Sequence, residues 1–432
     1  MVIRKSLYGH PAAGRRWAET RDQFILTHFN ETHDSWMYTC RRMLGEPCMF
    51  YIQRHHIHDV SKCDTTIMLI HTDDADMIGE SEEMFDFICN ACDKKWKIKV
   101  VDSDFMLGVK RELKDESGEF SVTLTMTAYI DGMVEAFKDE LPDHVNTPFP
   151  EHDKGFITKS EKVSDDDVQL YLNKGYMRMC GLILWAARNC FPECSLGASF
   201  LCRVMSCPSK KAYMAGLHMI RWLGQNRLRG IKFTHDPHGY PVAFSDASNK
   251  PDPTDSCKQY GYCIMWQGGP VAYVSKKLSH IGHSSAHNEY MALAEAGKSV
   301  VWLRQMLTEL EMFNLIDHPT TLFGDNNAAN ALTEDHFVSY GYQFIYLPYH
   351  AIKEWVELGF IKVARKKSAH NLSDLMTKNV TTSEIKMLLD ILTGYKLDHA
   401  ITYVADLILA HDVRTQYVLN ALVSTLIFID QQ

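Results

Sequence analysis

The spacing of apolar residues in the first part of the chain predicts an alternation of helices and strands. One helical face is expected from four residues at helical spacing, namely Trp17, Phe24, Ile25 and Phe29. Two apolar runs, residues 48–53 and 65–71, predict strands, and the second run enters the acidic turn HTDDADMIG. Residues 80–95 predict a second helix, and residues 97–101 and 104–111 predict a further pair of strands.

The pattern changes over residues 116–236, where helical spacing dominates after one hairpin-like stretch at 119–127. A helix is expected directly after that hairpin, and two more are expected over 167–188 and 210–228. Residues 148–167 are rich in Asp, Lys, Glu and Ser, a composition typical of a boundary between domains.

Residues 237–390 begin with three strands in quick succession, expected at 241–244, 261–266 and 271–275. A long helix over 284–311 follows, because its apolar positions recur every three or four residues. The remaining expected elements are a strand at 321–323, a short helix from Asn326, a helix near 349–358, a strand at 360–364 and a last helix from Asn371. This order predicts a mixed sheet covered by helices.

Composition narrows the class of protein. The length of 432 residues allows two or three domains, and the apolar and charged contents are those of an ordinary globular protein. No run of about 18 uncharged apolar residues occurs, and the first residues lack the apolar core of a secretory signal. Neither a membrane span nor secretion is therefore expected, and the twelve cysteines should be mostly free thiols. The net charge of −9 argues against strong non-specific binding of the whole chain to nucleic acid.

Four acidic residues fall where this pattern places strand ends and helix faces. Asp246 follows the apolar run VAF, Glu289 lies in the first turns of the long helix, Asp325 ends the run TLF, and Asp374 lies in the final helix. Carboxylates at the ends of neighbouring strands can converge, and such hard oxygen ligands suit Mg²⁺ or Mn²⁺. Two ions held in this way can promote phosphodiester hydrolysis. Each residue taken singly also fits turn or cap chemistry, so the inference rests on all four together.

Several motifs in this region occur in a fixed order: SDAS, YGYCIMWQGGPVAYVSKK, SSAHNEYMAL, FGDNN, YHAIKEW and NLSDLMTK. In order and spacing they resemble the ribonuclease H of copia-type retrotransposon Pol polyproteins, over residues 241–379. The resemblance implies a three-layer domain with a mixed five-stranded sheet. It also implies cleavage of RNA in RNA–DNA hybrids with two Mg²⁺ or Mn²⁺ ions as cofactors. Asp246, Glu289, Asp325 and Asp374 stand at the positions of its metal-binding, catalytic carboxylates.

Upstream segments extend the resemblance to residues 6–389. KSLYGHPAAGRRW and IHTDDADMIG are similar to reverse transcriptase motifs of the same family, so Asp73 and Asp74 stand at its polymerase catalytic pair. The fold class expected is α/β and α+β multidomain. The expected domains are a truncated reverse-transcriptase palm (1–115), a thumb- or connection-like region (116–236), a ribonuclease H domain (237–390) and a tail of unknown role (391–432).

Two departures from the family pattern argue against polymerase activity. The family uses a third metal-binding Asp on an earlier palm strand, and the sequence begins five residues before Ser6, so that strand is not in this sequence. We therefore expect no templated DNA synthesis from this chain alone, which primer extension would test. In addition, Thr72 and His71 precede the Asp pair where the family has an aromatic residue directly before it.

Three further residues are candidates for substrate binding. Ser248 could contact a phosphate or be a turn hydroxyl, and Asn326 could contact the hybrid or cap the next helix. His350 could assist proton transfer or simply face solvent from a helix.

The expected partners are RNA–DNA hybrid and other products of the polyprotein. The expected location is the cytoplasm, in virus-like particles, or the nucleus. The alternative function is a non-catalytic nucleic-acid-binding remnant or a degenerate transposon product.

Overall fold

The computed structural model describes residues 10–101, 104–116, 119–150, 163–236, 239–251, 256–334, 344–367 and 370–396. These residues form two compact units. Unit 1 contains the described residues up to 101 together with 305–312, and unit 2 contains the described residues of 104–304 and 313–396. The four domains expected from the sequence remain a prediction. Residues 1–9 and 397–432, which include Ser6 and most of the expected tail, lie outside the described residues.

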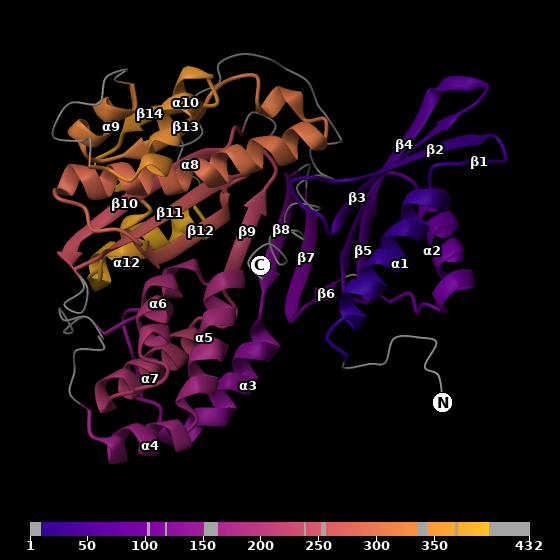
Figure 1. Cartoon of the computed structure of the whole chain (residues 1–432). Coiled ribbons are helices and arrows are strands. Elements are labelled where there is room, and N and C mark those ends of the chain that lie inside the picture. Colours follow the sequence, from indigo (N-terminus) through magenta and orange to yellow (C-terminus); the bar gives the residue numbers. More distant parts are fainter. Residues whose placement is uncertain are drawn as a thin grey trace. The chain divides into compact units, whose positions relative to one another are not determined.

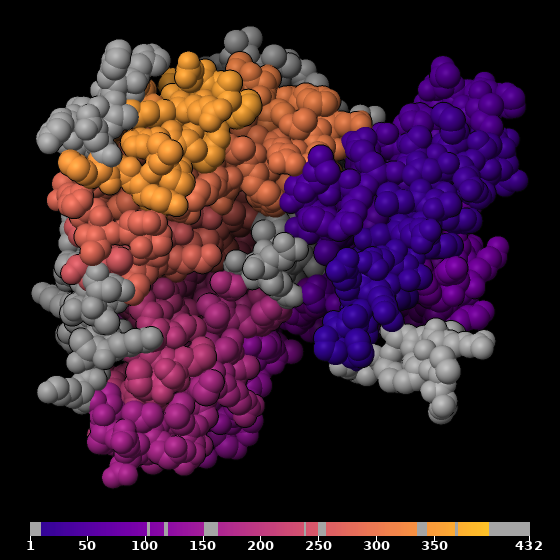
Figure 2. All heavy atoms as spheres, in the orientation of Figure 1, coloured from indigo at the N-terminus to yellow at the C-terminus, as the bar shows by residue number. Residues whose placement is uncertain are grey.

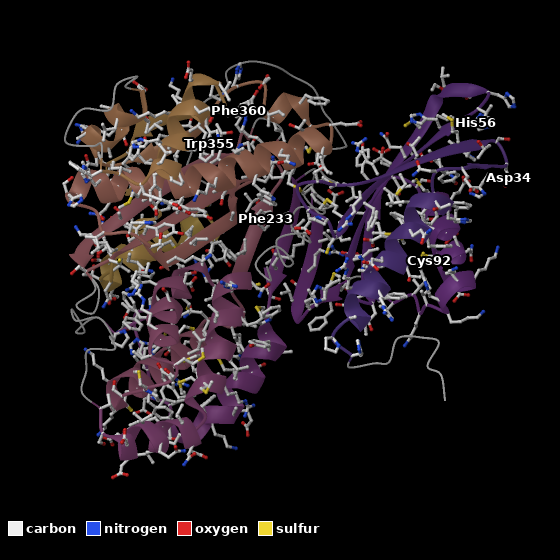
Figure 3. The ribbon with its side chains drawn as sticks, viewed as in Figure 1. Asp34, His56, Cys92, Phe233, Trp355 and Phe360 are labelled. Atoms are coloured by element: carbon white, nitrogen blue, oxygen red, sulfur yellow. The ribbon has the colours of Figure 1, made fainter. Side chains whose placement is uncertain are left out.

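Unit 1 is an antiparallel sheet with two helices on one face (Figure 1). Its strands, in spatial as well as chain order, are β1 (Thr32–His33), β2 (Trp36–Arg42), β3 (Met49–His56), β4 (Asp59–His71) and β5 (Asp74–Gly79). The helices are α1 (Ala13–His28) and α2 (Glu82–Trp96). Apolar residues of both helices, Ile25 and Cys92 among them, pack in one core with Phe50 and Met68 of the sheet. Figure 3 labels Cys92 on α2.

One predicted strand in this unit is wrong. Residues 97–101 follow the left-handed C-cap of α2 at Lys97 and form no regular structure. Their apolar side chains are exposed, with Val100 at 70% and Val101 at 66%. Alternation alone predicted a strand there, but a strand also needs a neighbour to satisfy its backbone groups.

The first half of unit 2 combines a small sheet with a group of helices. The antiparallel sheet contains β6 (Phe105–Met106), β7 (Val109–Glu116), β8 (Glu119–Thr125) and β9 (Gly230–Thr234). The helices are α3 (Thr127–Phe137), α4 (Asp165–Asn173), α5 (Tyr176–Asn189), α6 (Ser195–Arg203) and α7 (Lys210–Gln225). The single helix predicted over 167–188 is wrong, because Gly175 adopts φ +85° and separates α4 from α5.

The second half of unit 2 contains the expected mixed sheet, with strand order β12-β11-β10-β13-β14. Its strands are β10 (Val242–Pro251), β11 (Lys258–Trp266), β12 (Gly269–Lys277), β13 (Thr320–Gly324) and β14 (Ile361–Arg365). β10, β11 and β12 run antiparallel to one another, β13 is parallel to β10, and β14 is parallel to β13.

Helices lie on both faces of this sheet. They are α8 (Ser285–Glu309), α9 (Asn327–Glu334), α10 (Ala351–Glu357), α11 (Asp374–Thr377) and α12 (Thr382–Leu392). Tyr262 of β11 bonds Ser299 of α8, whereas its neighbour Gly261 lies against Met376 of α11. Successive residues of a strand face opposite sides, so α8 and α11 cover opposite faces.

Close packing joins the helices of the α8 face to each other and to the sheet. Trp355 of α10 lies against Gly297 of α8, where a side chain larger than hydrogen would collide with its ring (Figure 3). α9 and α10 form part of the outer surface of unit 2 (Figure 2). The apolar positions that predicted α8, such as Ala292, Ala296 and Val300, are buried as expected. None of the helices in the described ranges combines the length and apolar character needed to cross a bilayer.

Candidate active site

The register of the mixed sheet brings Asp246 and Asp325 level with each other. Phe244 of β10 pairs with Phe323 of the parallel strand β13, and each acid lies two residues farther along its own chain. Asp246 is within β10 and only 1% exposed, while Asp325 directly follows β13 and is half-buried. Because the two strands are parallel and paired in this register, the two carboxylates lie side by side just past the end of β13.

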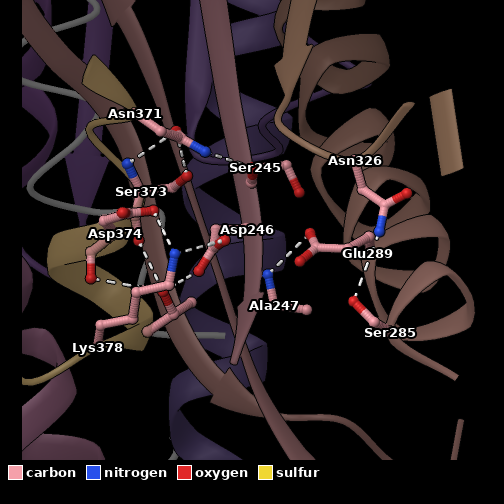
Figure 4. Close-up of polar contacts among 11 residues, drawn as sticks. Ser245, Asp246, Ala247, Ser285, Glu289, Asn326, Asn371, Ser373, Asp374 and Lys378 are labelled. Atoms are coloured by element: carbon pink, nitrogen blue, oxygen red, sulfur yellow. Dashed lines mark hydrogen bonds and ion pairs between the residues drawn. The ribbon is translucent and has the colours of Figure 1, made fainter. Parts of the chain in front are cut away.

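Glu289 approaches the same point from the second turn of α8. Its Oε2 accepts a hydrogen bond of 3.0 Å from the backbone N–H of Ala247, the residue after Asp246 (Figure 4). One carboxylate oxygen from each of Asp246, Glu289 and Asp325 lies within 4.8 Å of the others. Among the described residues, these three form the one group of at least three His, Cys, Asp or Glu side chains close enough to share a metal ion.

Asp374 is joined to this carboxylate cluster by a lysine. Lys378 Nζ lies 2.9 Å from Asp374 Oδ1 and 3.1 Å from Asp246 Oδ1 (Figure 4). The hydroxyl of Thr377 donates to Asp246 Oδ2. Thr377 and Lys378 were not among the site residues expected from the sequence, although both lie in the motif NLSDLMTK and Lys378 follows Asp374 at the i+4 spacing of a helical ion pair.

Two buried side chains hold this segment against β10. Asn371 Nδ2 donates to the carbonyl of Ser245 at 3.0 Å, and Ser373 Oγ donates to Asn371 Oδ1 at 2.6 Å (Figure 4). Asn371 and Ser373 are fully buried, so these bonds are shielded from competing water. They fix the position of the four-residue helix α11, and thereby the position of Asp374.

The electrostatics of the cluster fit a divalent cation. Burial, followed by the negative charges of Asp246 and Asp325, raises the pKa of Glu289 to about 9. Burial and Asp246 also raise the pKa of Asp325. Burial lowers the pKa of Lys378, but Asp246 and Asp374 outweigh that effect and the net shift is upward. Several carboxylates therefore share one ammonium group, which does not neutralise all of them. Such a group of hard oxygen ligands with excess negative charge suits Mg²⁺ or Mn²⁺.

A pH dependence of stability follows from the raised pKa of Glu289. In the unfolded chain this carboxyl titrates near its ordinary value of 4.5, so between that pH and about 9 the folded state holds the extra proton. Without metal, stability should fall as pH rises through this window. Mg²⁺ should oppose the fall, because a bound cation favours the ionised carboxylates.

Urea unfolding at pH 5.5 and pH 8.5, with EDTA or with Mg²⁺, measures this effect. In EDTA, the stability of Glu289→Gln should depend less on pH than that of the wild type, since the glutamine side chain does not titrate. If the free energy of unfolding in EDTA changes between the two pH values by the same amount in the wild type and in Glu289→Gln, the expectation is contradicted.

The other candidate residues lie in varied surroundings. Ser248 is buried. Asn326 Oδ1 accepts from the backbone N–H groups of Ala328 and Ala329 at 3.0 and 3.1 Å, so this side chain caps α9. His350 Nδ1 lies 3.0 Å from the hydroxyl of Tyr290, and burial lowers the pKa of His350. Roles for these three residues toward a substrate stay predictions.

Asp73 and Asp74 lie in unit 1, at the turn between β4 and β5, and both are exposed. The turn is held by α1, because the carbonyl of Thr72 accepts hydrogen bonds from Trp17 Nε1 at 2.6 Å and from Arg21 Nη1 at 3.3 Å. Within the described residues, neither acid belongs to a group of three possible metal ligands.

Comparison with known proteins supplies the family. Over 390 residues, 89% of its length, the chain is 23% identical to the retrovirus-related Pol polyprotein from transposon TNT 1-94 of Nicotiana tabacum, and the match covers 27% of that polyprotein. It is 22% identical over 378 residues to the retrovirus-related Pol polyprotein from transposon RE2 of Arabidopsis thaliana, with 87% of this chain and 24% of the relative covered.

A 131-residue segment, 30% of this chain, is 30% identical to the secreted RxLR effector protein 161 of Plasmopara viticola and covers 92% of it. No family model matches the chain. The chain spans about a quarter of the length of the two Pol polyproteins it matches. With its motifs, their order and these matches together, the chain belongs to the copia-type retrotransposon Pol polyproteins.

Proposed function

We propose that the mixed-sheet part of unit 2 is a ribonuclease H domain that cleaves the RNA strand of RNA–DNA hybrids. The observation that carries the proposal is the meeting of Asp246, Glu289 and Asp325 within 4.8 Å beside the end of β13. The five-stranded mixed sheet with helices on both faces supports it, as does the collinear set of motifs.

The side chains have distinct tasks in this proposal. Asp246, Glu289 and Asp325 hold divalent cations, with Asp374 completing the ligand set. When bound, two such ions supply an activated water and stabilise the oxygen that leaves. The N–H of Ala247 orients Glu289, and Thr377 orients Asp246. Because these contacts are buried, the carboxylates need little rearrangement before the substrate phosphate arrives. The products are a 3′-hydroxyl and a 5′-phosphate.

The test is cleavage of a labelled RNA–DNA hybrid by the purified chain in Mg²⁺. We expect cuts in the RNA strand with 5′-phosphate ends, and no cuts after EDTA. Double-stranded RNA and double-stranded DNA of the same sequence serve as substrate controls. Binding of the hybrid without cleavage would reject the nuclease and favour the non-catalytic, nucleic-acid-binding alternative.

We also propose that this chain alone does not synthesise DNA. Asp73 and Asp74 offer two exposed carboxylates, and no third possible metal ligand joins them among the described residues. Two ligands without a third should hold a pair of divalent ions poorly. Primer extension on an RNA template should therefore give no product, while any templated synthesis that disappears with Asp73→Asn would reject this proposal.

A further inference from the structure

The ammonium group of Lys378 lies between two carboxylates of the candidate site (Figure 4). It bonds Asp246 Oδ1 and Asp374 Oδ1 at 3.1 and 2.9 Å, so the link between these two acids is itself a cation. Glu289 and Asp325 lie close to Asp246 as well, without an ammonium group between them in the contacts described. Lys378 therefore bonds the acids on one side of Asp246 directly, and on the other side its charge partly offsets the raised pKa values of Glu289 and Asp325.

The surroundings of Lys378 allow its head group to leave. Its side chain is 38% exposed, whereas the side chain of Asp246 is 1% exposed and that of Asp374 is 13% exposed. Lys378 follows α11 directly, and its backbone N–H bonds the carbonyl of Asp374 at 2.9 Å. A long, flexible side chain anchored in this way can rotate its ammonium group into water while its backbone stays in place.

Lys378 and a divalent cation compete for the same oxygens. An ammonium group donates hydrogen bonds to carboxylates and has no lone pair to offer a metal, so it cannot become a ligand. A metal that binds Asp374 through Oδ1 must displace Lys378 from that oxygen, and a metal that binds through the other oxygen would lie beside the ammonium charge. In the group of Asp246, Glu289 and Asp325, which already lies together, the bond of Lys378 is to Asp246 Oδ1, and the N–H of Ala247 leaves the other oxygen of Glu289 available.

We propose that Lys378 is a displaceable counter-ion that makes the binding of divalent cations sequential. The first cation binds at Asp246, Glu289 and Asp325, and a second binds weakly because it must displace Lys378 from Asp374. This inference rests on the proposed metal site, and it assigns to Lys378 the control of the second affinity.

Titration calorimetry with Mn²⁺ on the purified chain tests the inference without measuring activity. We expect two unequal dissociation constants for the wild type. Lys378→Met keeps most of the apolar stem but removes the charge, and it should tighten the second constant by roughly 5- to 150-fold, the usual range for coupling between two ligands. Lys378→Arg should leave the ratio of the two dissociation constants close to that of the wild type, because it keeps the positive charge.

The outcomes separate the inference from the function on which it rests. If wild type and Lys378→Met each bind two Mn²⁺ ions with the same ratio of the two dissociation constants, the role of Lys378 is rejected and the metal site stands. If neither chain binds Mn²⁺, both proposals fail.

A second measurement uses only the wild-type chain, in case the Met variant does not fold. The rate at which a lysine-specific acylating reagent modifies Lys378, followed by mass spectrometry, should rise as Mn²⁺ fills the second site. The exposed Lys62 of unit 1 is the internal control and should show no change. A rate at Lys378 that is constant, or that falls, through the titration would overturn the inference.

Discussion

Asp246→Asn should lower the rate of hybrid cleavage by on the order of 10³-fold or more, because several kcal/mol of transition-state stabilisation depend on the bound cations. The change removes the charge of the residue that bonds Thr377 and Lys378 and acts electrostatically on Glu289. Its shape is almost unchanged, so the loss should come from chemistry. The measurement is the initial rate of RNA cleavage at saturating Mg²⁺.

The stability of Asp246→Asn is a second measurement, and it should not fall when the cleavage rate falls. In EDTA, Asp246→Asn should be at least as stable as the wild type, because it removes the charge that raises the pKa values of Glu289 and Asp325, while Lys378 keeps Asp374 as a partner. Asp139→Asn makes the same chemical change at an exposed position of unit 2 and should leave cleavage unchanged. Equal cleavage by wild type and Asp246→Asn would exclude the proposed site.

Gly261→Ala should destabilise unit 2 by about 1–3 kcal/mol and also reduce cleavage. Gly261 pairs with Asp246 across β10 and β11, and α11 passes directly over it. A Cβ at Gly261 would lie 2.3 Å from Met376 Cβ and 3.2 Å from the carbonyl carbon of the same residue. Backbone is involved, so a rotamer change cannot relieve the clash and α11 must shift. The shift would carry Thr377, Lys378 and Asp374 away from Asp246.

Urea unfolding and the cleavage assay together measure this effect. The matched control is Gly132→Ala in α3, where nothing lies within 4 Å of the added methyl group. That variant should gain about 0.5–1 kcal/mol, since alanine is the better helix former, and should cleave at the wild-type rate. If Gly261→Ala matches the wild type in both stability and cleavage, α11 does not need its close approach to β11.

The sequence predicted the first part of the strand that carries Asp246, over 241–244, and the helix that carries Glu289, because both have local patterns; β10 continues through Asp246 to Pro251. Alternation of apolar residues marks a strand, and apolar spacing of three or four marks a helix such as α8. The meeting of Asp246, Glu289 and Asp325 follows from the register between β10 and β13, which no local pattern contains.

The prediction of one last helix from Asn371 is wrong, because α11 begins at Asp374 and is separate from α12. The helix that carries Asp374 has only four residues and is held by Asn371 and Ser373 through side-chain hydrogen bonds to β10, so apolar spacing carries no information about it. The involvement of Lys378 was missed for the same reason. A lysine after a short helix is ordinary on a surface, and only the folded chain brings its ammonium group to Asp246.

The order of the elements along the chain has a consequence for biosynthesis. Asp246 lies on the central strand of the mixed sheet, whereas α11, which brings Asp374, Thr377 and Lys378, comes near the end of the described residues. A nascent chain emerges from the ribosome amino end first, so it exposes Asp246 and Glu289 long before their last partners are made. Unfinished translation products would therefore carry an incomplete set of carboxylates, and cutting of nucleic acid would await synthesis of the whole domain.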